Sequence, residues 1–391
     1  MTVALADDAS DLGSALTSGK AGVQVRARYE RVDQDNLNEK ADAVTARLRL
    51  NYATGQWNGW SAFAEFDHVF HILDDFNSGA GTSPGKGQYP VVADPEGSDL
   101  NQLYLDYKVA DDWKARVGRQ RILLDNQRFV GGVGWRQNEQ TYDSLTLNTD
   151  AIGNTVLQYS YVANVRRIFG ERVAAGSDKT NHHLLNANIS LNQAWSLVPY
   201  LYYLDYKEDA RATSSSVTFG ARFAGKLDAG DGKLAVVFEF AAQSDAADNP
   251  DSYDADYLHV DAMWALDDGF SIGLGYENLG SDDGSQSFST PLATLHKFQG
   301  WADQFLATPA AGIEDIYATV KFNAGDWNLT GVYHDFSADT GGADFGKEFD
   351  LSAATSLGSN YGLLFKGAFF SADAPAYTDT SKFWIMLTAS Y

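Results

Sequence analysis

Cysteine is absent from this chain of 391 residues, so neither disulfide nor thiolate chemistry is possible. Basic residues are scarce: 29 Lys and Arg stand against 52 Asp and Glu, and the formal net charge is −23. Binding to nucleic acid needs a basic surface, so no nucleic-acid partner is expected. The chain also lacks the run of about 20 apolar residues that a membrane-spanning helix requires.

Signs of catalysis are missing as well. The nucleophile motif Gly-x-Ser-x-Gly does not occur. On a strand, His68 and His71 would point to opposite faces, and so would the neighbours His182 and His183, which argues against a shared metal. We therefore predict that the protein is not an enzyme and has no catalytic residue, no metal ligand and no cofactor.

The acidic residues crowd into segments that we predict to be loops, and this pattern indicates a solvated, acidic outer surface. The alternative is a loosely bound divalent cation at these loops, because clustered carboxylates suit hard cations. None of the clusters has the spacing of a calcium-binding loop. They comprise Asp74, Asp75, Asp94, Glu96 and Asp99; Asp245, Asp248, Asp251 and Asp254; and Asp282 and Asp283.

The sequence does contain a repeated alternation of apolar and polar residues, about ten residues at a time, separated by turns. In residues 382–391, one strand face would carry Phe383, Ile385, Leu387, Ala389 and Tyr391. Alternation of this length without a long apolar run is typical of an all-β protein of one kind, an antiparallel transmembrane β-barrel. Such a barrel also reconciles 13% aromatic residues with a mean hydropathy of −0.30, because only alternate residues face lipid.

Turn residues divide the alternating segments into about eighteen strand candidates. Their predicted ranges are 20–33, 41–53, 58–72, 99–109, 113–125, 141–149, 154–169, 181–192, 195–207, 214–226, 233–244, 254–266, 270–280, 313–323, 327–338, 347–358, 361–372 and 381–391. No stretch ahead of the strands is long enough for a separate plug domain. We predict one barrel domain over residues 20–391.

The connections alternate between short turns and long loops, the latter at 73–98, 126–140, 170–180, 245–253 and 281–312. Short periplasmic turns and long extracellular loops are the rule for outer-membrane barrels. A soluble β-sandwich or β-propeller, the alternative, would not produce this alternation. An even strand number predicts that both termini are periplasmic, and residues 1–19 then represent a signal remnant with a periplasmic lead-in.

The alternation also predicts which side chains face the lumen. Arg26 and Arg28 oppose Val25 and Ala27 in the first strand, and Arg47 and Arg49 share one face of the second. Arginine facing lipid at mid-depth costs several kcal/mol, so these four arginines should point inward. We expect a basic patch on the lumen wall.

Further charged residues extend the predicted lining of the pore. The fifth strand poses a conflict, because Arg116 and Arg119 cannot both face inward without a bulge. Inward acids on other strands would produce a transverse field that selects solutes by charge, unless the charges neutralise each other in a packed lumen. The additional pore-lining candidates are Arg116, Arg119, Arg128, Arg136, Glu65, Asp106, Glu239 and Asp261.

The long loop 281–312 is unusually rich in aromatic residues, among them Phe298, Trp301 and Phe305. So many rings would be poorly solvated on a loop in water. We expect this loop to fold into the lumen and narrow it, or to cap its mouth.

Several short motifs together resemble the alginate-export family of outer-membrane porins. They are Gly118-Arg119-Gln120, the segment 125–131, Trp135-Arg136-Gln137-Asn138, Tyr142-Asp143 and the loop segment 294–303. The resemblance covers most of the chain. It implies a monomeric barrel of eighteen strands, with an arginine-rich constriction that passes anionic polyuronate, and it suggests Arg119, Arg128 and Arg136 as pore arginines.

These observations predict a diffusion channel of the bacterial outer membrane for small polar, anionic solutes such as uronate oligosaccharides. The expected partners are outer-membrane lipid, lipopolysaccharide and the solute itself. The alternative is a surface protein without transport, an adhesin or receptor whose lumen is occluded. A trace of single-channel conductance would separate the two.

Overall fold

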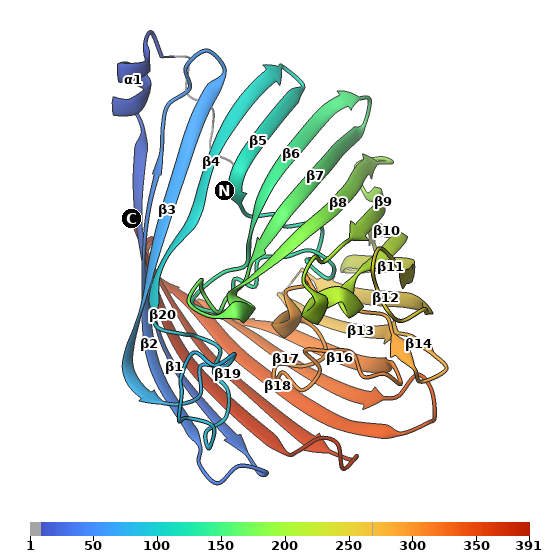
Figure 1. Ribbon diagram of the computed structural model, residues 1–391. Helices are drawn as coiled ribbons and strands as arrows, with labels where there is room; N and C mark the ends of the chain where they lie inside the picture. The colour runs from blue at the N-terminus through green and yellow to red at the C-terminus, as the bar shows by residue number, and fades with distance from the viewer. Residues whose placement is uncertain (1–8, 268) are drawn as a thin grey trace.

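The computed structural model describes residues 9–267 and 269–391, and its strands form a closed antiparallel barrel (Figure 1). Within these residues, eighteen long strands make up one sheet, each paired with its neighbours in the chain. The last strand pairs with the first over Gln24–Gln34, and this pairing closes the ring. The predicted antiparallel barrel of eighteen strands is confirmed.

The long strands are β1 (Lys20–Gln34), β2 (Ala41–Ala53), β3 (Trp60–Asp75), β4 (Gly97–Ala110), β5 (Trp113–Gln120), β6 (Thr141–Ile152), β7 (Thr155–Arg166), β8 (Ser177–Ser190), β9 (Trp195–Leu204), β10 (Ser216–Asp228), β11 (Gly232–Asp245), β12 (Asp254–Leu266), β13 (Phe270–Leu279), β16 (Ile313–Ala324), β17 (Trp327–Ser337), β18 (Asp344–Leu357), β19 (Tyr361–Ala372) and β20 (Thr380–Ser390). Two short strands, β14 (Ser281–Asp282) and β15 (Gln286–Ser287), pair within a loop. The helix α1 (Leu12–Thr17) precedes β1. In the described part of the chain, no helix has the length and apolar character needed to cross a membrane.

The two ends of the barrel differ in their connections. At one end the strands are joined by short turns such as 111–112, 153–154 and 325–326. The opposite end carries long connections, which we name by their flanking strands: the β3–β4 loop (76–96), the β5–β6 loop (121–140) and the β13–β16 loop (280–312). The predicted signal remnant at Ala4-Leu5-Ala6 lies outside the described residues.

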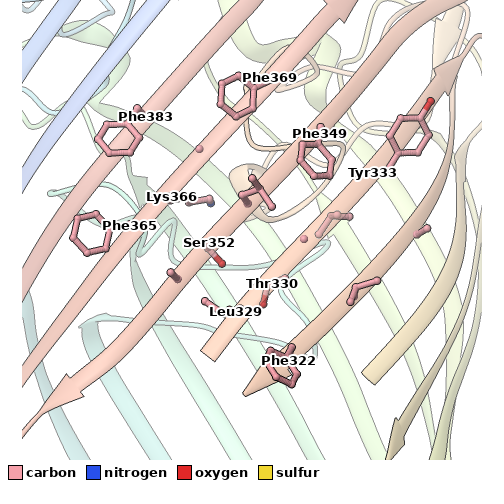
Figure 2. Close-up of a pocket in the computed structure, with 17 residues that line it drawn as sticks. Phe322, Leu329, Thr330, Tyr333, Phe349, Ser352, Phe365, Lys366, Phe369 and Phe383 are labelled. Carbon is pink, nitrogen blue, oxygen red and sulfur yellow. The ribbon is translucent and has the colours of Figure 1, made fainter. Parts of the chain in front are cut away.

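The outward face of the barrel is apolar. On β16 to β20, Phe322, Phe349, Phe365, Phe369 and Phe383 project around a shallow groove of about 730 Å³ (Figure 2). All except Phe365 are more than two-fifths exposed. Rings exposed in this number suit contact with lipid, and this is the pattern of an outer-membrane barrel.

The hydrophobic core lies inside the ring of strands, between the wall and the loops that enter it. Phe129 of the β5–β6 loop packs against Tyr200 and Tyr257 of the wall, with ring centroids 5.2 Å apart in both pairs. Phe288 of the β13–β16 loop joins them at 5.8 Å from Phe129. The two loops also pair directly, since the N–H of Gly131 donates to the carbonyl of Leu292 at 2.9 Å.

Strand β5 is shorter than the sequence suggests. The predicted segment 113–125 ends at Gln120, because Ile122 and Leu124 leave the wall and are buried in the interior cluster. Gly118 adopts a φ of 128°, and a Cβ at this position would meet the carbonyl oxygen of Leu103 at 2.3 Å. A glycine is therefore required two residues before the chain turns inward.

We expect Gly118→Ala to destabilise the barrel by about 2 kcal/mol or more, because it adds backbone strain and a clash with backbone. The free energy of unfolding in lipid vesicles, measured by denaturant titration, tests this. Gly87→Ala is the control, since nothing lies within 4 Å of an added Cβ and φ is not in the left-handed region. Equal stability of the two variants would contradict the account of this strand end.

Candidate functional site

The four wall arginines of β1 and β2 point inward, and the β5–β6 loop covers them. Arg26 faces Arg47 across the strand pair. Arg28, Arg47 and Arg49 are all buried, while Arg26 is half-buried. The predicted direction of these side chains therefore agrees with the strand register, but the loop separates them from open solvent.

Backbone carbonyls of the covering loop accept hydrogen bonds from three of these arginines. Arg26 donates to the carbonyls of Gly134 and Arg136, each at 3.0 Å. Arg28 donates to the carbonyl of Trp135 at 2.6 Å and Arg47 to that of Gln137 at 3.0 Å, and these two bonds continue the series. A guanidinium presents several fixed donors, which suits it to hold irregular backbone that has no strand partner.

The β3–β4 loop supplies a carboxylate to the same wall. Asp94 is 0% exposed and accepts from Arg28 at 2.6 Å and from the N–H of Gln137 at 2.7 Å. Burial alone would raise the pKa of Asp94, but the guanidinium groups of Arg28 and Arg136 outweigh it and hold the pKa below its usual range. Asp94 is thus no part of a solvated acidic surface, and for this residue that prediction was wrong.

Glu139 joins the second strand to the start of the β5–β6 loop. It accepts from Arg49 at 2.7 Å and from Arg121. Burial opposes the charge of Glu139, yet these two arginines hold its pKa well below the usual range. Arg49 also forms a two-point pair with Asp67, and Arg121 reaches Glu65 at 2.5 Å.

Arg128 ties both infolded loops to the opposite wall. It donates to Glu277 of β13 at 2.7 Å, and to Thr290 and Gln299 of the β13–β16 loop at 3.2 and 3.0 Å. The ring of Phe298 lies 4.7 Å from its guanidinium carbon. Arg128 is buried and every partner is polar or aromatic, so it fastens the interior and does not present a free charge.

Arg136 forms a second fastening near β1 and β20. It donates to Glu30 at 2.9 Å and to Asp303 of the β13–β16 loop at 3.3 Å, and Lys382 donates to Asp303 at 2.6 Å. Burial would raise the pKa of Asp303, but His296, Lys382 and Arg136 hold it well below its usual range.

The aromatic residues of the β13–β16 loop pack against the inner face of the barrel and are shielded from bulk water. Phe305 is buried, 4.7 Å from Phe336 and 4.9 Å from Tyr377 between ring centroids. Trp301 is half-buried, and its backbone N–H donates to the carboxylate of Glu348 of β18. This loop therefore lies in the lumen against β17 to β20.

Arg119 was predicted to line the pore, and the structure places it on the outward face. It stands opposite Leu103 and follows Val117 by two residues, and these two side chains are 50% and 49% exposed. Arg119 donates instead to Asp143 at 2.9 Å and to Glu171 at 3.1 Å. The strand pairings show no bulge between Arg116 and Arg119, so the alternation turns them to opposite sides.

The remaining predicted lumen residues are paired with one another or with neighbours. Arg116 faces inward, donates to Asp106 at 2.6 Å and lies over the ring of Tyr104 at 3.8 Å. Arg222 donates to Glu239 at 2.7 Å, and the hydroxyl of Tyr317 donates to Asp261 at 3.1 Å. Acids and bases therefore largely neutralise each other in the wall.

Sequence patterns missed the loop carboxylates that complete this network, Glu139 and Asp303. A usable signal exists in principle, because buried arginines require counter-charges nearby. The pattern could not say which loop acids would be taken, because Arg49 and Glu139 lie 90 residues apart.

Among the described residues, an inner and an outer cavity lie between the infolded loops and the wall. The inner cavity, of about 620 Å³ at the short-turn end, is lined among the described residues by five basic side chains, Lys20, Lys108, Lys114, Arg116 and Arg121, and one acid, Asp106. The outer cavity, of about 400 Å³, is lined by Arg136, Arg167, Lys382 and Asp303, together with His296, three glutamines and apolar residues. Basic side chains therefore outnumber acidic ones in the lining of both cavities, within a chain of net charge −23.

Comparison with known proteins relates the chain to one family and to one fold. The family model described as alginate export matches residues 19–276. No curated protein sequence matches the chain. Solved structures of similar fold include OccK9 (OpdG) of Pseudomonas aeruginosa, at 15% identity with TM-score 0.75 over 96% of this chain and 99% of that one. OccK3 (OpdO) of the same organism gives 13% identity and TM-score 0.73 over 97% of both chains. OccAB2 of Acinetobacter baumannii gives 15% identity and TM-score 0.74 over 97% of this chain and 99% of that one.

Proposed function

Because the chain belongs to the alginate export family, we propose that it is a diffusion channel of the bacterial outer membrane for small anionic solutes such as uronate oligosaccharides. The observation that carries this proposal is the basic lining of both interior cavities in a strongly acidic chain. The acidic residues elsewhere lie in loops or are paired. A solute in the cavities is therefore affected more by the charges that line them than by the net charge of the chain.

The arrangement suits a selective passage more than a wide water-filled pore. The two infolded loops are fastened in the lumen by Arg28, Arg128 and Arg136, and the β3–β4 loop adds Asp94, which pairs with Arg28. A solute has to pass between this fixed interior and the remaining wall, where Arg116 and Arg121 present donors beside the ring of Tyr104. Carboxylates and hydroxyls of a uronate could exchange water for these donors without any energy source beyond the solute gradient.

The lysines at the inner cavity provide the test of charge selectivity. Changing Lys20 and Lys114 to Glu should shift the reversal potential in a salt gradient from anion preference towards cation preference, because both line the inner cavity. The effect should be largest at low salt, where the Debye length is about 10 Å at 0.1 M, and should fall at 1 M, where it is about 3 Å.

The matched control changes Lys179 and Lys347 to Glu, two exposed lysines that line neither cavity. This double variant has the same net charge and should leave the reversal potential near that of the parent. Cation preference in the parent protein, or equal shifts in both double variants, would overturn the assignment of anion selectivity to the inner cavity.

A second function has a specific observation in its favour. Loop and wall rings such as Phe129, Tyr142 and Phe288 are almost fully buried in the lumen, so much of the interior is packed. Such a filled barrel suits a surface receptor or adhesin without transport. Absence of single-channel conductance from a correctly folded protein would favour this function over a channel.

We further propose that the short-turn end faces the periplasm and that the protein acts as a monomer. The backbone of Tyr391 pairs with Val23, so the last strand ends beside the start of the first, at the short-turn end. Short turns on the periplasmic side are the rule for outer-membrane barrels. Accessibility of tags at both ends to periplasmic protease, with intact cells as the control, tests this orientation.

A further inference from the structure

A buried lysine stands where the wall meets both infolded loops. Lys366 projects inward from β19 and is 8% exposed. Its Nζ lies 3.7 Å from the ring centroid of Trp301, 4.3 Å from that of Trp135 and 5.4 Å from that of Trp384. Trp301 belongs to the β13–β16 loop, Trp135 to the β5–β6 loop and Trp384 to β20, so three separate parts of the chain surround one ammonium group.

The hydrogen bond from this ammonium group determines which ring nitrogen of His296 carries the proton. Nζ of Lys366 lies 2.7 Å from Nε2 of His296, and the ammonium form of lysine can only donate, so Nε2 accepts from it. The ring proton is then on Nδ1, which donates to Asp303 at 2.7 Å. Burial lowers the pKa of His296 to about 3, in keeping with a neutral imidazole at neutral pH.

The aromatic rings around Nζ of Lys366 favour a cation at this position. The His296 ring stacks on Trp135 with centroids 4.6 Å apart and planes at 9°, and both rings meet Trp384 edge-on. A desolvated ammonium gains from the faces of tryptophan rings, and without such partners its burial would be costly. An apolar side chain of the same length would fill the space but would leave Nε2 of His296 without a donor.

Other contacts anchor the β13–β16 loop after His296 without involving Lys366. Glu348 accepts from the N–H groups of Trp301 and Ala302, and Phe305 is held in its own aromatic cluster. Loss of the ammonium group should therefore loosen segment 294–303 and the Trp135 region without unfolding the barrel.

We propose that Lys366 is a positioning residue that, together with the fastenings of Arg128 and Arg136, holds both infolded loops in the lumen and thereby sets the width of the passage. The role of Lys366 in holding the loops does not depend on the function of the protein, whereas its role in setting the width of the passage rests on the proposed channel function. Lys366 need not touch the solute: it acts through Trp135, Trp301 and His296.

The absence of cysteine allows a direct readout of loop position. Ala302 is 1% exposed, so a single Ala302→Cys reporter should react slowly with a water-soluble maleimide while the loop is in place. In this background, Lys366→Met should raise the rate of modification by about tenfold or more, as local opening becomes more frequent. Lys366→Arg keeps a cation that can stack on the same rings, and should stay near the parent rate.

Two further variants make the experiment decisive. Lys321→Met, an exposed lysine of β16, controls for loss of a lysine elsewhere and should leave the rate unchanged. Trp301→Leu removes the nearest ring from the loop side with the wall intact. It should reproduce the faster labelling, and it takes the place of Lys366→Met if that variant does not assemble into a barrel.

Conductance measured on the same proteins, without the reporter, completes the test. Lys366→Met should give a larger and noisier single-channel conductance than the parent, and Lys366→Arg should restore the parent value. Unchanged labelling in Lys366→Met, or equal labelling in the Met and Arg variants, would overturn the proposal. Faster labelling in a protein that never conducts would support the positioning of the loops by Lys366 and would overturn the channel function instead.

Discussion

Replacing residues 295–306 with a short Gly-Ser linker should raise the single-channel conductance by about twofold or more. These residues make contacts that hold the β13–β16 loop against the wall, through the side chains of His296, Asp303 and Phe305. They fill space inside the ring of strands, and the strands themselves pair independently of them. Their removal should therefore widen the passage and leave the barrel closed.

The control for this deletion is removal of residues 36–39, which lie in the exposed connection between β1 and β2. That change should not affect conductance, because the segment does not line either cavity. Heat-modifiable migration on gels confirms that each variant is a folded barrel. An unchanged conductance in the folded 295–306 variant would show that this loop does not restrict the passage.

The second large effect is expected at Arg128. Arg128→Met should lower the free energy of unfolding by about 3–5 kcal/mol, the usual loss when one partner of a buried ion pair is removed. Glu277 is 3% exposed, and in this variant its buried carboxyl group would lose its main partner. Gln299 and Thr290 would each lose a hydrogen-bond donor. Denaturant titration in lipid vesicles measures this loss.

The double variant Arg128→Met with Glu277→Gln separates charge from packing. It removes the unpaired carboxylate, so it should recover much of the lost stability. If the double variant is as unstable as Arg128→Met, the loss comes from the contacts of Arg128 with the loops and not from the charge of Glu277.

The course of the strands followed from the sequence because alternation is a local property. In β2, Arg47 and Arg49 alternate with Ala46 and Leu48, and the cost of arginine in lipid is enough to choose the inward face. The same rule showed that Arg116 and Arg119 conflict, but not which of the two faces lipid. The pairing of Arg119 with Leu103 and Asp143 decided it, and pairing across strands is not contained in either strand alone.

By itself, the sequence determined that this protein is an antiparallel barrel with an inward basic patch, because strand period, turn residues and the cost of charge in lipid act within a few residues of each other. Only the tertiary structure decided what those charges do. Arg26 and Arg28 hold the β5–β6 loop more than 100 residues away, and Asp94 and Asp303 arrive from two other loops. Buried charges take whichever partner the closed chain brings within about 3 Å, and no local pattern specifies that partner.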